Sequence, residues 1–279
     1  MLADLSILDL VPALRPDWRS PYHLSDWCEC IEGAILGGAR ALCSEPFQHY
    51  KSCTTNVGIV WLLLRRPQTH VVYLTHSHEK AQAESQNLRE LWKLAGGKFR
   101  DGFNKIGDWQ TPEGGGCVAM SAQQSKLGYP CDVLLVDDPL DETEYMVDEV
   151  RRKVDETIGF YTARAATHLN SILIVASRWH PDDPIGLRLQ RKAVTWREIN
   201  HPGIVGYSDP PEGVPIMTHL ERVGASAFAP EVLDLVRHVQ MRAEWEELDP
   251  SLRKWWAQVQ NNPLPDATGF FAGERLYID

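Results

Sequence analysis

The sequence predicts an α/β protein in which a mostly parallel central sheet is packed between two layers of helices. Three runs rich in leucine and β-branched residues, at 40–45, 131–137 and 171–177, are predicted to be strands, and each ends in polar residues. Buried parallel strands are typically continuous apolar runs of this kind. Open α/β sheets bind their ligands where the carboxyl ends of the strands meet. The polar ends of these strands are therefore the predicted position of a ligand-binding or catalytic site.

The strand at 131–137 ends in two adjacent carboxylates, Asp137 and Asp138, followed by Pro139. Two acids at a strand end suit a nucleotide-bound Mg²⁺ and a polarised water, as in a Walker B strand. A buried strand that ends in a polar turn is the alternative, because aspartate and proline are ordinary turn residues. This segment alone does not decide between the two interpretations.

The strand at 40–45 is followed by a loop, a Lys-Ser pair at Lys51 and Ser52, and an apolar helix at 57–64. This order is that of a P-loop (Walker A), in which backbone N–H groups cradle phosphate, lysine binds the β/γ-phosphates and serine holds Mg²⁺. Glu45 and Tyr50 stand where the motif has glycine, so we expect Tyr50 to hold a strained left-handed turn at roughly 1–3 kcal/mol. The predicted nucleotide-binding residues are Pro46, Phe47, Gln48, His49, Tyr50, Lys51, Ser52 and Cys53.

The third strand, at 171–177, ends at Ser177 and is followed by the polar segment 178–183. In ATPases with an additional central strand, this element places a polar group near the γ-phosphate. Three strand ends with phosphate-compatible chemistry make three unrelated polar turns the weaker interpretation. Together they predict a three-layer P-loop NTPase of the additional-strand (ASCE) type.

The order of three segments, PFQHYKS, GGGCVAMSAQQSKLGYPCDVLLVDDP and SILIVASRWHPDD, resembles the ATPase domain of the large terminase subunit of tailed bacteriophages. The similarity extends over roughly residues 20 to 272. The DDP and SRWHPDD segments are its most specific parts. The P-loop departs from the family, which usually has His-Gly-Lys-Ser where this chain has His49-Tyr50-Lys51-Ser52.

The resemblance implies an ATP-hydrolysing motor, with ATP and Mg²⁺ as cofactors, that drives double-stranded DNA into a procapsid. It implies Lys51 on the phosphates, Ser52 and Asp137 on Mg²⁺, and Asp138 orienting or deprotonating the attacking water. Ser177 is the third catalytic candidate, at the sensing position. A cation from a neighbouring subunit would complete the site, and the candidates for it are Lys126 and Arg164.

The implied partners are the portal protein and the small terminase subunit, together with DNA. We expect a monomer in solution, a homo-oligomeric ring on the capsid, and a location in the host cytoplasm, transiently at the portal vertex. The net charge of −10 is unusual for a protein that grips DNA statically, and a motor that steps along DNA needs a local, releasable phosphate contact rather than a wholly basic surface. There is no apolar run long enough to span a membrane, and the six scattered cysteines are expected to be reduced core thiols.

Two alternatives stay open. Glu45 and Tyr50 motivate a degenerate P-loop docking module of a split terminase, with weak or no ATPase activity. A helicase-like ATPase keeps the same sheet but lacks recognisable helicase motifs after residue 180.

The predicted organisation is an N-terminal arm at 1–22, an ATPase core at 23–202 and a C-terminal helical and linker subregion at 203–279. The prolines of the first segment discourage a long helix. Large terminases continue into a nuclease domain, and no nuclease site is expected in this chain, so we expect an excised ATPase domain or a terminase split between polypeptides. Further expected elements are a strand at 70–75, helices at 23–36, 79–95, 148–164 and 231–256, and a linker-like excursion at 203–223.

Overall fold

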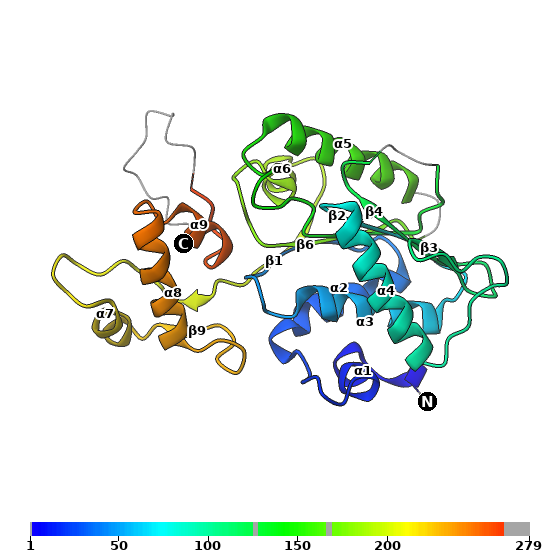
Figure 1. Ribbon diagram of the computed structural model, residues 1–279, viewed down its shortest axis with the longest axis horizontal. Coiled ribbons are helices and arrows are strands. Elements are labelled where there is room, and N and C mark those ends of the chain that lie inside the picture. Colours follow the sequence, from blue (N-terminus) through cyan, green and yellow to red (C-terminus); the bar gives the residue numbers. More distant parts are fainter. Residues whose placement is uncertain (1, 125–127, 166–168, 265–279) are drawn as a thin grey trace.

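A computed structural model describes residues 2–124, 128–165 and 169–264, and it contains a seven-stranded sheet with the order β3-β4-β2-β5-β6-β1-β7 (Figure 1). All neighbouring strands are parallel except the β3–β4 pair, which is antiparallel. The predicted α/β fold with a mostly parallel central sheet is therefore confirmed. The strands are β1 (Arg40–Ser44), β2 (His70–Thr75), β3 (Asp108–Gln110), β4 (Gly116–Ser121), β5 (Val133–Asp137), β6 (Ser171–Ala176) and β7 (Arg197–Asn200).

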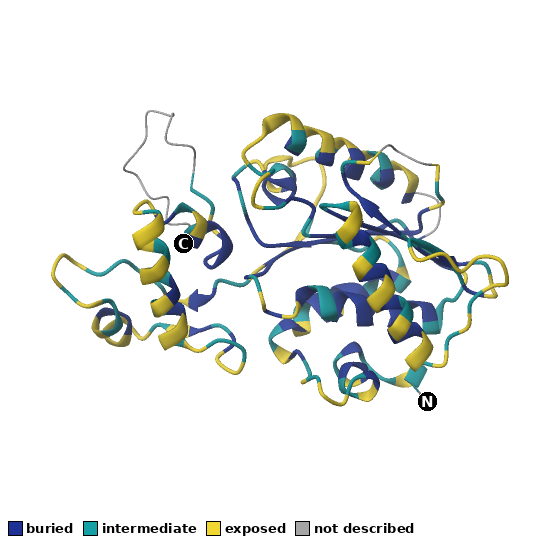
Figure 2. Ribbon diagram, viewed as in Figure 1, coloured by how far each residue is buried: buried dark blue, intermediate teal, exposed yellow. Residues whose placement is uncertain are grey.

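Helices cover both faces of the sheet, and each face has its own apolar cluster. In β2, Val71 and Tyr73 belong to the cluster on one face, whereas Val72 and Leu74 belong to the cluster on the other. Figure 2 shows the strands as the most deeply buried layer between the helices. One layer contains α1 (Ile7–Leu14), α2 (Ser25–Gly33), α3 (Lys51–Arg65) and α4 (His78–Leu94), and the other contains α5 (Asp148–Arg164) and α6 (Pro184–Gln190).

The N-terminal segment is packed on the core, which differs from the arm expected at residues 1–22. Leu10 and Leu14 of α1 are buried in the cluster that also contains residues of α3. Pro12 lies inside α1, where it cannot donate a helical hydrogen bond to the carbonyl of Leu8. The Ser20 hydroxyl donates to that carbonyl instead, at 2.9 Å. The substitute donor explains how a helix with an internal proline persists here.

The strand at 70–75 and the helix at 148–164 have the predicted bounds, and most other predicted elements are present with shifted ends. The single helix expected at 23–36 is divided into a 3₁₀ turn (Tyr22–Leu24), α2 and a second 3₁₀ turn (Ala34–Leu36), and the helix after the P-loop begins at Lys51 rather than near 57. The β3–β4 pairing was not predicted. No helix in the described part of the chain has the length and apolar character needed to cross a bilayer. The six cysteines are free, and five of them are buried.

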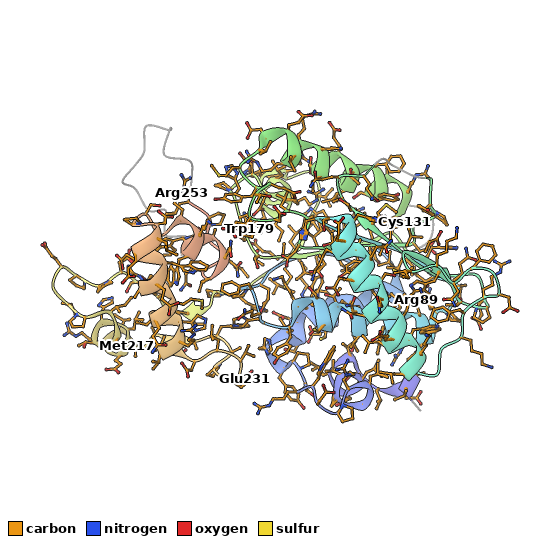
Figure 3. All side chains as sticks on the ribbon, in the orientation of Figure 1. Arg89, Cys131, Trp179, Met217, Glu231 and Arg253 are labelled. Carbon is orange, nitrogen blue, oxygen red and sulfur yellow. The ribbon has the colours of Figure 1, made fainter. Side chains whose placement is uncertain are left out.

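The C-terminal subregion lies at the left of Figure 1 and contacts the segments that follow β1 and β6, where Phe47 stacks on Trp245 and Arg178 bonds to Asn261. It contains β8 (Ile204–Val205), α7 (Ile216–Val223), β9 (Ser226–Ala227), α8 (Leu235–Leu248) and α9 (Arg253–Gln258). The linker-like excursion thus contains a strand and a helix, and the region 231–256, where one or two helices were expected, contains two, α8 and the start of α9. Trp179, after β6, and Arg253 of α9 line a small pocket between this subregion and the core (Figure 3).

Candidate functional site at the carboxyl ends of β1, β5 and β6

Three predicted site residues meet at one edge of the sheet. The Lys51 ammonium lies 3.0 Å from Asp138 Oδ2 and donates to Ser177 Oγ at 3.0 Å. The backbone N–H of Ser177 donates to Asp138 Oδ1 at 2.9 Å. The three residues come from the segments after β1, β5 and β6, which are adjacent parallel strands, so their carboxyl ends lie together. Strand order in the sheet therefore brings together groups that are far apart in the sequence.

The loop between β1 and α3 has the geometry of an anion-binding turn. Gln48 and Tyr50 have φ angles of 62° and 64°, in the left-handed region. Tyr50 is the N-cap of α3, and no side chain caps this 15-residue helix. The first N–H groups of a helix have no partner within the helix, and together with the helix dipole they favour phosphate. This loop can therefore bind a phosphate group through its backbone.

Tyr50 holds the left-handed turn that the sequence predicted for it. Its ψ is 13°, and half of its side chain is exposed. A residue other than glycine in this conformation costs roughly 1–2 kcal/mol, because its Cβ crowds the backbone. The tyrosine ring lines a cavity of about 290 Å³ together with Ser20, His23 and Glu231. The ring therefore borders open space beside the phosphate-binding turn.

Asp137 is fully buried at the end of β5 and only partly satisfied. The Tyr73 hydroxyl donates to its Oδ2 at 2.6 Å, whereas Oδ1 is buried without a hydrogen-bond partner among the described residues. Burial and the charge of Asp138 raise the pKa of Asp137 to about 6, although the Tyr73 hydrogen bond and the nearby Ser52 hydroxyl oppose the shift. An orphan carboxylate oxygen next to a serine hydroxyl is a suitable oxygen pair for Mg²⁺. Ser52 and Asp137 can hold this ion.

Lys51 stays charged in spite of its burial. Burial would lower the pKa of Lys51, but the carboxylates of Asp138 and Asp137 outweigh it and raise the pKa. Asp138 itself has a φ of 44°, a left-handed conformation that aspartate adopts more readily than most residues. Its backbone N–H donates to the carbonyl of Val175 at 3.0 Å, so the position of its backbone is fixed by β6.

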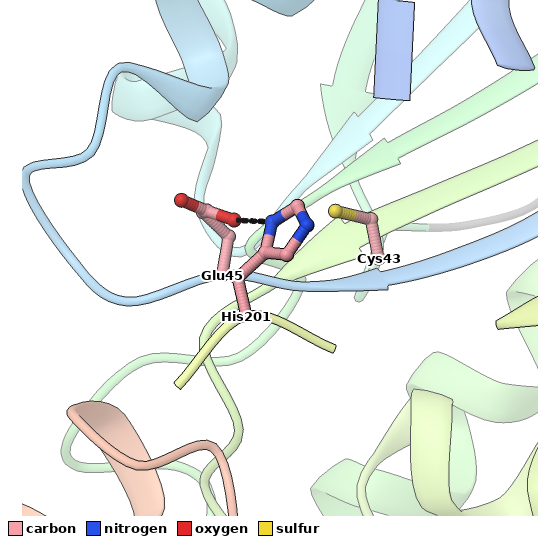
Figure 4. A group of neighbouring side chains, drawn as sticks. All are labelled: Cys43, Glu45 and His201. Atoms are coloured by element: carbon pink, nitrogen blue, oxygen red, sulfur yellow. Dashed lines mark hydrogen bonds and ion pairs between the residues drawn. The ribbon is translucent and has the colours of Figure 1, made fainter. Parts of the chain in front are cut away.

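Glu45, which occupies the position of the first P-loop glycine, points away from the phosphate-binding turn and onto His201. His201 Nδ1 lies 2.6 Å from Glu45 Oε2, and Nε2 lies 2.9 Å from Asp26 Oδ2. Figure 4 shows the contact between Glu45 and the ring, with the Cys43 thiol on the other side. Burial opposes a charge on His201, but the hydrogen bonds and charges of Asp26 and Glu45 outweigh it and raise its pKa to about 9. Burial raises the pKa of Glu45 to about 7.

Cys43, Glu45 and His201 lie close enough together to be considered as metal ligands, with ligand atoms within 4.8 Å of one another. Both ring nitrogens of His201 are already bonded to carboxylates, and both of the pKa shifts favour bound protons. A metal ligand would have to give up one of these bonds and a proton. The cluster is therefore best described as a protonated histidine between two acids. The histidine pairs with Glu45, so the Glu45 carboxylate does not face the phosphate-binding turn as an unpaired charge.

The remaining predicted residues have varied environments. Pro46 and His49 are buried, Gln48 is exposed, and Cys53 is half-buried in the first turn of α3. Phe47 stacks on Trp245 of α8 with ring centroids 5.8 Å apart.

The two candidate trans cations, and two aromatic residues of the segment before the P-loop, have the following positions. Lys126 lies outside the described residues. Arg164 is exposed at the end of α5, over Phe160 and near Cys131, at the amino end of β5. Within one subunit it therefore lies at the opposite end of β5 from Asp137. Trp27 is a core residue that donates to Thr55, and only His23 borders the cavity next to Tyr50.

Sequence reasoning missed a second layer of polar groups around the site. Glu84 of α4 is buried, accepts from Asn56 at 2.7 Å and holds Lys80 at 2.5 Å. Burial opposes the charge of Lys80, but its bond to Glu84 and the nearby charges of Asp137 and Asp138 raise its pKa. Lys80 is thus a cation of the same subunit beside the acidic pair. Its position shortly after the strand at 70–75 was the available signal, because β2 is adjacent to β5.

Comparison with solved structures shows that the same fold occurs in a bacteriophage large terminase. The crystal structure of the HK97 bacteriophage large terminase matches 91% of this chain with a TM-score of 0.56 and 15% identity. The Thermus phage P74-26 large terminase ATPase domain matches 50% of this chain and 59% of its own length, with a TM-score of 0.32 and 16% identity. No protein-family model matches the chain, and no curated protein is similar to it in sequence.

The first of these similarities confirms the resemblance predicted from the sequence, at the level of fold: the chain has the P-loop α/β fold of a phage large terminase. It spans about half of that protein, 54% of its length. The whole terminase's activity and partners are therefore a matter of proposal for this chain.

Replacing Tyr50 with glycine should raise the free energy of unfolding by roughly 0.5–1 kcal/mol, because glycine adopts the left-handed turn without strain. Tyr50→Ala is the matched control: it removes the same ring but keeps a Cβ, so it should give no increase. Urea unfolding of the three proteins measures the difference. Equal stabilities of the glycine and alanine variants would show that the turn carries no strain.

The His201 cluster should make stability depend on pH. Because the pKa of His201 is raised from 6.5 to about 9, its contribution is fully present below pH 6.5 and is lost as the pH rises through 9. The excess stability of the wild type over His201→Gln should thus shrink by roughly 1–3 kcal/mol across this window. Urea unfolding at both ends of the window tests this, with the exposed His78→Gln as control. A constant difference would mean that His201 is not held as a cation.

Proposed function

We propose that this chain is the ATP-hydrolysing motor domain of a viral terminase large subunit and drives double-stranded DNA into a procapsid. The observation that carries the proposal is the convergence of Lys51, Asp138 and Ser177 beside a loop whose backbone suits phosphate. A buried lysine, two strand-end acids and an uncapped helix N-terminus are the parts that P-loop ATPases use for phosphoryl transfer. The fold shared with the HK97 large terminase supports the packaging context.

Each of the site residues has a separate proposed role in ATP hydrolysis. The P-loop backbone and Lys51 bind the β/γ-phosphates of ATP. Ser52 and Asp137 hold Mg²⁺, which neutralises phosphate charge when it is bound. Asp138 orients the attacking water or accepts its proton, and Ser177, bonded to both Lys51 and Asp138, reports on the state of the γ-phosphate.

Binding of ATP requires an exchange at Lys51. The ammonium of Lys51 is paired with the Asp138 carboxylate at 3.0 Å. A phosphate that takes this ammonium releases Asp138, and the free carboxylate can then accept a proton. The carboxylate of Asp138, the proposed base, can therefore accept a proton from water only when a substrate phosphate occupies the loop. Without bound phosphate, Asp138 stays paired with Lys51 and cannot act as a base.

The proposed partners are double-stranded DNA, the portal protein and the small terminase subunit. We place the protein in the host cytoplasm as a monomer that forms a ring at the procapsid portal vertex. A neighbouring subunit would supply a cation to the transferred phosphate, for which Arg164 is suited by its exposure and its distance from its own subunit's site. Lys80 is the competing candidate from within the subunit.

A degenerate docking module is the second candidate function. The observation that favours it is the packing of P-loop residues against the C-terminal subregion, where Phe47 stacks on Trp245 and His49 lies 6.5 Å from Phe228. A loop held in this way could serve as part of an interface without turnover. Calorimetric titration with Mg²⁺ and a non-hydrolysable ATP analogue separates the two functions, because only the motor requires binding.

Asp138→Asn should retain nucleotide binding and lower ATP hydrolysis by about 10²–10⁴-fold, as expected when a general base or a water-orienting group is removed. Asp137→Ala should instead weaken the Mg²⁺-dependent binding itself. The control is Asp182→Asn, an exposed acid after β6. Steady-state hydrolysis and calorimetric binding are measured for each. Undiminished hydrolysis by Asp138→Asn would remove this residue from the mechanism.

If a neighbouring subunit completes the site, specific ATPase activity should rise with protein concentration, because dilute protein is monomeric. The measurement is hydrolysis per subunit over a hundredfold range of concentration, together with the sedimentation of each sample. The effect should disappear in the variant that lacks the trans cation, Arg164→Ala or Lys126→Ala. A high activity that does not depend on concentration would instead assign the cation to the same subunit, with Lys80→Ala as the variant that abolishes it.

A further inference from the structure

Asn261, which follows α9, ties the C-terminal subregion to the core through one buried side chain. It is 2% exposed and has a φ of 50°. Its Oδ1 accepts a hydrogen bond from the backbone N–H of Arg178 at 3.2 Å, and its Nδ2 donates to the carbonyl of His201 at 2.7 Å. Both polar atoms of the amide are therefore used, and both of their partners are backbone groups of the ATPase core.

These two partners lie on either side of the strand that leads into the P-loop. Strand β1 is paired with β6 on one side and with β7 on the other, and Ser44 lies opposite both Ala176 and Asn200. Arg178 is the second residue after β6, and His201 is the first residue after β7. The Asn261 amide thus spans the end of β1 at the point where the P-loop leaves the sheet.

Two further hydrogen bonds join the residues on either side of β1 to the start of the P-loop. Together with the two bonds of Asn261 they form a closed set of contacts, here called the frame. The His201 N–H donates to the carbonyl of Ser44 at 2.9 Å. The Ser177 hydroxyl donates to the carbonyl of Glu45 at 3.0 Å. Because Asn261 joins Arg178 to His201, it connects the two sides of this frame. A displacement of its side chain would release the turn after β6 from the segment after β7.

The chemistry of asparagine fits this position closely. Its backbone adopts the left-handed conformation more readily than most residues, and its amide offers one donor and one acceptor to two different backbone groups. An ionised aspartate can only accept hydrogen bonds, so it would set a negative charge against the His201 carbonyl. Glycine would keep the backbone conformation and lose both side-chain bonds. Asparagine therefore supplies three properties that no near-isostere combines.

We propose that Asn261 is a positioning residue for ATP hydrolysis, and that it acts through Ser177. This inference rests on the proposed ATPase function. Ser177 accepts from Lys51, and its backbone N–H donates to Asp138, so the turn that begins at Ser177 and Arg178 sets where both groups lie. By holding the N–H of Arg178, Asn261 holds this turn in place. The C-terminal subregion is thereby a working part of the ATPase site.

The experiment compares Asn261→Asp with Asn262→Asp in the full chain. The control makes the same chemical change at the next residue, which is exposed. Asn261→Asp should lower kcat roughly 10- to 100-fold, as small misplacements of reacting groups do, and leave KM within about 3-fold. Asn262→Asp should change neither constant by more than about 3-fold. A loss of thermal stability with unchanged kcat in Asn261→Asp would make Asn261 a merely structural residue.

A double-mutant cycle tests whether Asn261 acts through Ser177. In a Ser177→Ala background, Asn261→Asp should lower kcat less than it does in the wild type, because the hydroxyl bonded to Lys51 is already gone and only the Ser177 N–H to Asp138 is left to be positioned. Multiplicative losses in the double variant would overturn the inference. If Asn261→Asp does not fold, Asn261→Gly takes its place in the same cycle, since glycine retains the left-handed backbone.

The wild-type protein separates failure of this inference from failure of the proposed function. If the wild type binds and hydrolyses Mg·ATP but the cycle is multiplicative, the inference about Asn261 is wrong and the proposed ATPase function stands. If the folded wild type does not bind Mg·ATP in calorimetry, the ATPase function is wrong, and the positioning role is wrong with it.

Discussion

The buried ammonium of Lys51 is the constraint on which the rest of this site depends. Lys51 is only 6% exposed, and an unpaired ion in such a place costs several kcal/mol. It must therefore have a carboxylate and a hydroxyl within reach, and Asp138 and Ser177 supply them at 3.0 Å each. These groups come from two other strands. The charge is satisfied only when β1, β5 and β6 end at the same level, which their register provides.

The same requirement explains how the chain tolerates an acid at the start of its P-loop. A carboxylate that faced the phosphate site would repel nucleotide and compete for Lys51. Glu45 is instead completely buried and turned toward His201, which shares protons with it and with Asp26. The substitution of glycine by glutamate is thus matched by a histidine from the segment after β7, and the polar group has become a link between that segment and the loop.

The sequence was sufficient to predict four of the seven strands and the positions of Lys51, Asp138 and Ser177 at three strand ends, but not β3, β4 or β7. Continuous apolar runs identify buried parallel strands, and parallel strands bring their carboxyl ends together whatever the loops between them do. His201 and Asn261 could not be found in this way. They lie 156 residues from Glu45 and 83 residues from Arg178, respectively. The contact of His201 depends on the pairing of β1 with β7, and the contact of Asn261 depends on how the C-terminal subregion folds back. A single sequence carries no periodic signal for such a return.

Asp138 shows how a fixed backbone can support a movable proton acceptor. Its left-handed φ of 44° and its N–H bond to Val175 leave the backbone no freedom, so an exchange of partners at Lys51 is confined to side chains. One carboxylate oxygen stays attached to the Ser177 N–H while the other is released from the ammonium. Retention of the first bond keeps the freed carboxylate at the site. The position of the freed carboxylate then depends on the turn at Ser177, and therefore on Asn261, which holds that turn from outside the sheet.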